Sequence, residues 1–76
     1  MATNKGRLIK ALVQGGGFGR DLMKISGLKP SELAGAVDDI PPSILTVKGS
    51  LSADSIADSY IVISSGRHKE AMSLID

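Results

Sequence analysis

A glycine-rich run at residues 15–19 limits most strongly what this chain can form, because four of its five positions are glycine. Glycine loses more backbone freedom on folding than any other residue, so a helix or strand is not expected to continue through the run. The run therefore predicts a hinge or linker. It would separate an N-terminal segment, residues 1–14, from a small domain, residues 20–76.

The N-terminal segment has the pattern of a short amphipathic helix. Its apolar side chains recur with helical spacing, and basic residues lie among them. The apolar side consists of Leu8, Ile9, Leu12 and Val13, and the basic cluster consists of Lys5, Arg7 and Lys10. Isolated helices of fewer than about 12 residues are marginal in water. Residues 1–14 are therefore predicted to form either a short helix or an extended arm that becomes ordered on a partner.

Residues 20–37 predict two short helices joined by a turn. The first, residues 20–26, would end at Gly27, since glycine suits the left-handed cap of a helix. Pro30 can occupy the first position of the second helix, which would run to about Val37. Prolines 41 and 42 then close the segment, because the residue before a proline avoids helical geometry.

The second half of the chain predicts β structure. Residues 44–48 are a strand candidate, and residues 59–64 are rich in the β-branched side chains that strands favour. The tail, residues 68–76, fits a helix or a third strand equally well. The predicted fold class is α+β: short N-terminal helices and a glycine-rich hinge, followed by a small antiparallel β-hairpin or sheet.

The size of the chain predicts a need for partners. A 76-residue chain forms one domain, and a domain of that size buries only about 60% of its unfolded surface. Small domains usually gain stability from disulfides, a metal or another subunit. The sequence has no cysteine and a single histidine, which leaves oligomerisation or docking on a larger protein as the favoured source. Only two residues, Phe18 and Tyr60, are aromatic, so the predicted core is thin.

The net charge of +1 conceals an asymmetry between the halves of the chain. Up to Val37 there are six basic residues and two acids, a net of +4; from Asp38 onward there are three basic residues and six acids, a net of −3. A basic half can bind nucleic acid or a membrane surface. It can equally meet the acidic half of a neighbouring subunit.

Catalysis and cofactor binding are not expected. The glycine run fails the spacing of the dinucleotide fingerprint, whose sixth position must be glycine, and no Gly-Lys-Ser/Thr follows it. A nucleophile requires a base held by a third group, and the single imidazole, His68, lies between two basic residues. The chain is therefore predicted to be neither an enzyme nor a metal or cofactor carrier. A run long and apolar enough to span a membrane is also not found.

Residues 20–37 also allow a helix–turn–helix interpretation, in which Arg20, Lys24 and Lys29 would contact DNA phosphates. Two features speak against it. Met23 occupies the position where a small residue usually lets the two helices cross closely. The second helix also lacks the Arg, Asn or Gln side chains that read bases well. A small helix–turn–helix-like DNA-binding protein is the alternative prediction.

Two passages, MATNKGRLIKALV and LAGAVDDIPPSI, resemble segments near the N-termini of tail-fibre and other small virion structural proteins of marine bacteriophages. The resemblance implies a virion component, assembled in the host cytoplasm, that docks through its N-terminal arm and oligomerises through strands. The first prediction is therefore a structural assembly protein: a tail, fibre, adaptor or capsid-decorating subunit. Its predicted contacts are Leu8, Ile9, Leu12, Val13, Tyr60, Ile61 and Ile63.

Overall fold

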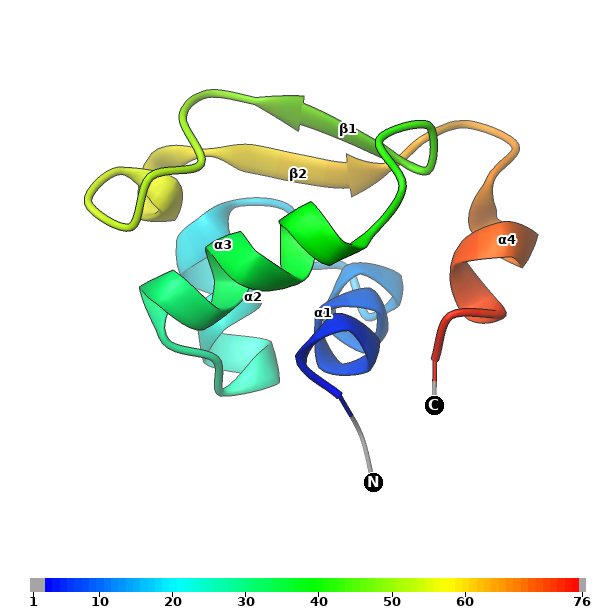
Figure 1. The fold of residues 1–76 in the computed structure, drawn as a ribbon, viewed down its shortest axis with the longest axis horizontal. Helices are drawn as coiled ribbons and strands as arrows, with labels where there is room; N and C mark the ends of the chain where they lie inside the picture. The colour runs from blue at the N-terminus through cyan, green and yellow to red at the C-terminus, as the bar shows by residue number, and fades with distance from the viewer. Residues whose placement is uncertain (1–2, 76) are drawn as a thin grey trace.

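The computed structural model describes residues 3–75. Three helices precede a two-stranded antiparallel sheet, and a further short helix follows it (Figure 1). In chain order the elements are α1 (Asn4–Val13), α2 (Gly19–Ser26), α3 (Pro30–Asp39), β1 (Leu45–Lys48), a 3-10 turn η1 (Ile56–Asp58), β2 (Tyr60–Ile63) and α4 (His68–Met72). The predicted α+β class, with helices before an antiparallel hairpin, is confirmed.

The N-terminal segment is a helix, not an extended arm. Thr3 caps it, because its hydroxyl accepts a 3.1 Å hydrogen bond from the N–H of Gly6. The apolar face of α1 packs against α2 and α3, and Leu8 and Ile9 are completely buried there. α1 therefore belongs to the same core as the rest of the chain.

The glycine run, predicted to be a hinge, is packed against the sheet. Gly17 accepts a 2.7 Å hydrogen bond from the N–H of Ile61, and Gly19 donates a 2.8 Å bond to the carbonyl of Ser59. A Cβ on Gly19 would lie 1.7 Å from the carbonyl oxygen of Ile56, so no larger residue fits without movement. Glycine is therefore needed here because it lets the chain pass close to η1 and β2.

The two predicted central helices and the turn between them are present. α2 ends at Ser26 and is capped by Gly27, whose φ of 76° is left-handed and whose N–H donates to the carbonyl of Met23 at 2.8 Å. α3 begins at Pro30, and the carboxylate of Glu32 accepts a 2.9 Å bond from the N–H of Lys29. α3 runs two residues beyond the predicted end, to Asp39.

The hairpin lies as a layer over the helices in Figure 1. β1 and β2 pair with Leu45 opposite Ile63 and Val47 opposite Ile61. Buried residues alternate along β2, so Ile61 and Ile63 face the helices while Tyr60 faces outward. The tail, for which helix and strand were both open, forms α4, and Ala71 anchors that helix in the core.

The core is aliphatic, and neither aromatic side chain is buried in it. α1 contacts both α2 and α3, while η1, in the loop that joins the two strands, packs against α2. The largest apolar side chains that are fully buried are Leu8, Ile9, Leu22, Leu33, Ile56 and Ile61. This small apolar core agrees with the prediction from composition.

Candidate functional site

Helices α2 and α3 and the turn between them contain the basic residues that the sequence predicts for DNA contact. α2 and α3 contact each other, and residues 27–29 form the turn between them. The side chains of Leu22, Leu28 and Leu33 are buried, and they pack the two helices and the turn against the core. The angle between α2 and α3 is therefore fixed by packing and not only by the turn.

The three basic residues predicted for DNA contact all reach the surface of this unit. Arg20 lies at the start of α2, Lys24 in its last turn and Lys29 at the cap of α3, and each is exposed. The Arg20 guanidinium is 3.2 Å from the carboxylate of Asp58 and lies 5.6 Å from the centre of the Phe18 ring. Arg20 is thus partly engaged by its own chain, whereas neither lysine forms an ion pair within residues 3–75.

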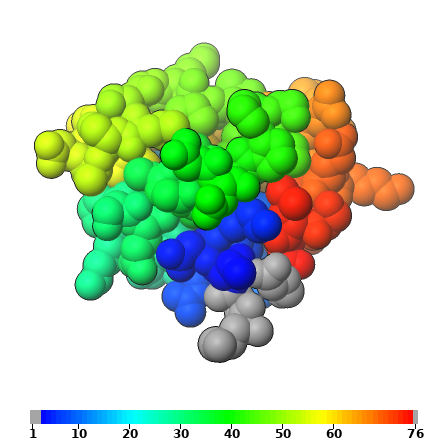
Figure 2. All heavy atoms as spheres, in the orientation of Figure 1, coloured from blue at the N-terminus to red at the C-terminus, as the bar shows by residue number. Residues whose placement is uncertain are grey.

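The outer face of α3 is exposed and built from small side chains in its first half. In Figure 2 the atoms of α3 occupy the middle of the face in view, beside the loop that joins the strands. Ser31 and Gly35 lie on this outer face, followed by Asp38 and Asp39 at the far end. Because a helix rises about 1.5 Å per residue, Asp38 lies about 10 Å along α3 from Ser31.

The loop at residues 49–59 projects from the hairpin and is held by hydrogen bonds among its serines. The hydroxyls of Ser52 and Ser55 are 2.7 Å apart, and the buried hydroxyl of Ser59 donates to the carbonyl of Ser50. The charged side chains of this loop are Asp54 and Asp58, both acidic. The loop is therefore tied to the core but adds no positive charge beside α3.

The residues predicted for protein contacts divide into two groups. Leu8, Ile9, Leu12, Ile61 and Ile63 are buried in the chain's own core, so they are not available to a partner in this fold. Val13 and Tyr60 reach the surface, with 49% and 40% of their areas exposed. Apolar periodicity identifies which face of an element is covered, but it does not tell whether the covering element is in the same chain.

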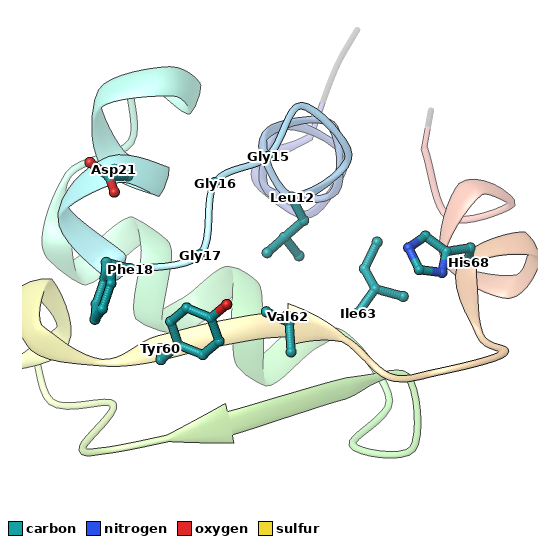
Figure 3. Close-up of a pocket in the computed structure, with 10 residues that line it drawn as sticks. All are labelled: Leu12, Gly15, Gly16, Gly17, Phe18, Asp21, Tyr60, Val62, Ile63 and His68. Atoms are coloured by element: carbon teal, nitrogen blue, oxygen red, sulfur yellow. The ribbon is translucent and has the colours of Figure 1, made fainter.

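An aromatic pair was missed by sequence reasoning because Phe18 lies in the glycine run. Its ring meets that of Tyr60 edge-to-face, with centroids 5.1 Å apart, and both side chains remain substantially exposed. The pair borders a hollow of about 430 Å³ that extends along β2 to His68 (Figure 3). The sequence signal that could have indicated this pair was an aromatic residue lying between glycines.

A second hollow, of about 410 Å³, lies between the end of α1 and α4. Val13 and Met72 line it and are each 49% exposed, with Ile75 beside them. Two elements distant in sequence thus place an apolar patch at the surface.

No chemistry-bearing cluster appears within residues 3–75. No three side chains of His, Cys, Asp or Glu gather as metal ligands, and every buried side-chain polar atom there has a hydrogen-bond partner. None of the described helices is long and apolar enough to cross a bilayer. Searches of protein-family models, curated proteins and solved structures find no match to this chain.

Proposed function

We propose that this chain is a small DNA-binding protein of the helix–turn–helix type, with α3 as the element that enters the groove. The observation that carries the proposal is the arrangement of α2, turn, α3 and hairpin, with the outer side of α3 exposed and the hairpin loop beside it. In helix–turn–helix units the second helix lies in the major groove while the first crosses the backbone.

The first half of α3 provides the contact with the bases. The hydroxyl of Ser31 can donate to or accept from a base edge. Ala34 and Gly35 offer little bulk, which lets the helix backbone approach the groove floor. The N-terminus of α3, with its positive end of the helix dipole, faces the DNA backbone together with Lys29.

The surrounding charges make this a weak and only mildly salt-dependent binder. Arg20, Lys24 and Lys29 are the phosphate-binding groups, and three contacts predict a slope of about −2.7 in log K against log salt. The exposed acids Asp38 and Asp39 lie at the far end of α3 and oppose the phosphates. Weak affinity follows from this balance.

Titration of a mixed-sequence DNA duplex at two salt concentrations, followed by fluorescence anisotropy, tests the proposal. Replacing both Lys24 and Lys29 by Ala removes two phosphate contacts, so the slope is expected to become less negative by about 1.8. Lys69→Ala is the matched control, because Lys69 is also exposed but lies on α4, away from the helix–turn–helix. Circular dichroism checks that each variant is folded. Absence of binding at low salt, or an equal loss in the control, would refute the proposal.

A second candidate function, an assembly subunit such as a phage virion component, is favoured by one observation. Val13 and Met72 expose apolar area next to the same hollow, which suits a protein contact. Light scattering after size exclusion separates the two candidates. Assembly would be supported by an oligomer that does not bind DNA and that Met72→Glu disrupts. Detection of the chain by mass spectrometry in purified particles would support it further. A DNA-binding monomer would argue against it.

A further inference from the structure

Both aromatic side chains of the sequence lie together outside the core. Phe18 is 45% exposed and Tyr60 is 40% exposed, although the core of this small domain is entirely aliphatic. Aromatic side chains bury more apolar area than most others, so keeping both at the surface forgoes a large contribution to stability. Their joint exposure favours a role in binding over a role in folding.

Backbone pairing places the two rings and a lysine in one row. Phe18 forms an antiparallel bridge with Tyr60, next to the 2.7 Å bond from the N–H of Ile61 to the carbonyl of Gly17. On the other side of β2, Lys48 of β1 lies directly opposite Tyr60. Side chains of residues directly opposite each other project from the same face of a sheet. Lys48, Tyr60 and Phe18 therefore lie side by side on the outer face.

The two rings are held in place by the fold. A Cβ on Gly17 would lie 2.7 Å from Cε1 of Tyr60, so this ring rests directly on the glycine backbone. The Phe18 ring meets it at an interplanar angle of 70°, with centroids 5.1 Å apart, and Figure 3 shows the two rings next to each other. Side chains that are ordered before binding lose little conformational entropy when a ligand arrives.

A cation lies at each end of this row. Lys48 is exposed at one end, and at the other the guanidinium of Arg20 lies 5.6 Å from the centre of the Phe18 ring. The carboxylate of Asp58 is 3.2 Å from that guanidinium, but the two side chains are 63% and 83% exposed, and such ion pairs are weak. Arg20 can therefore exchange Asp58 for a phosphate.

We propose that this aromatic row, which consists of Lys48, Tyr60, Phe18 and Arg20, binds single-stranded DNA. Unpaired bases stack on the two rings, and the cations at the ends hold the phosphates. Every base has a π-face, so such a site accepts many sequences. Cations on both sides of exposed rings match a polymer that carries bases and phosphates together, whereas an apolar contact with a protein would not require them.

The aromatic row is separate from the proposed site for duplex DNA. It lies on the outer face of the hairpin and at the start of α2, and Arg20 is the residue that the two sites share. Stacking requires bases with free faces, which a duplex does not offer because its bases are already stacked. The proposal therefore does not rest on duplex binding by α3.

The probe is fluorescein-labelled octathymidylate, titrated into the full chain and followed by anisotropy. Tyr60→Leu keeps an apolar side chain but removes the ring, so it should weaken binding roughly fivefold or more, whereas Tyr60→Phe keeps the ring and should bind within about twofold of the original chain. Tyr60 is the single tyrosine of a chain without tryptophan. Quenching of its fluorescence by unlabelled octathymidylate therefore reports stacking directly, and circular dichroism checks that each variant is folded.

Salt dependence tests the phosphate contacts. Two contacts with a single strand predict a slope of about −1.4 in log K against log salt, and Lys48→Ala should make it less negative by about 0.7. Lys10→Ala is the matched control, because Lys10 is also exposed but lies on α1, outside the row. It should leave the slope unchanged.

The outcomes also separate this proposal from duplex binding. Replacing both Lys24 and Lys29 by Ala should weaken binding of the duplex but not of octathymidylate, and Tyr60→Leu should do the reverse. The proposal is overturned if octathymidylate does not bind at low salt, if Tyr60→Leu and Tyr60→Phe bind it equally well, or if its binding leaves the tyrosine fluorescence unchanged.

Discussion

Replacement of Gly35 by alanine should stabilise the protein, although it adds an atom. Gly35 lies inside α3 on its outer side, and a Cβ built there meets nothing within 4 Å. Glycine is less favourable than alanine by about 0.8–1.0 kcal/mol in a helix interior, so Gly35→Ala should raise the free energy of unfolding by about 0.8 kcal/mol. For a domain of this size that corresponds to an increase in Tm of about 3–6 °C.

Gly27→Ala is the matched comparison, because a Cβ there also meets nothing within 4 Å. Gly27 differs in its φ of 76°, a left-handed conformation that costs a residue with a Cβ about 1 kcal/mol. Gly27→Ala should therefore lower Tm by a similar amount. Thermal denaturation followed by circular dichroism measures both. Destabilisation by Gly35→Ala, or a shift of the same sign in both variants, would refute the reasoning.

The same Gly35→Ala variant also reports on the proposed function. Its added methyl group lies on the face of α3 that would approach DNA, so DNA affinity should fall while stability rises. These opposite changes cannot both come from partial unfolding. Unchanged DNA affinity in a stabilised variant would indicate that α3 does not enter the groove.

Three further substitutions have definite expected outcomes. Gly19→Ala places a Cβ 1.7 Å from the carbonyl oxygen of Ile56, so it should cost at least about 2 kcal/mol, seen as a lower urea midpoint. Ser59→Ala removes a buried hydroxyl that bonds a loop carbonyl and should cost about 1 kcal/mol in the same assay; a neutral result would show that water replaces the bond. Asp58→Asn breaks an exposed ion pair, so stability should change by less than about 1 kcal/mol, while anisotropy should show tighter DNA binding because a negative charge is lost.

The secondary structure could be predicted from local sequence signals because its causes are local. Gly27 and Pro30 set the end of one helix and the start of the next through their own backbone geometry. The β-branched run that forms β2 likewise carries its own preference. α3 extends to Asp39 because the prolines that stop it come only at 41 and 42.

The role of the glycine run could not be predicted, because its cause is remote in sequence. The backbone freedom of glycine suggested a hinge, whereas Gly19 is required by contact with Ile56, far along the chain. The same limit applied to Leu8 and Ile9. Their apolar pattern was correctly identified, but the covering surface comes from α2 and α3. Pairing of Phe18 with Tyr60 depends on the same tertiary contact.

The crossing of the glycine run against β2 has a consequence for how the molecule opens. The hydrogen bonds of Gly17 and Gly19 join the start of α2 to the last strand, so the start of α2 cannot detach without also freeing the hairpin. Helix α2 and the final strand should therefore exchange their amide protons in a single cooperative step. A protease that cuts glycine-rich linkers should then find this segment protected until the whole domain unfolds.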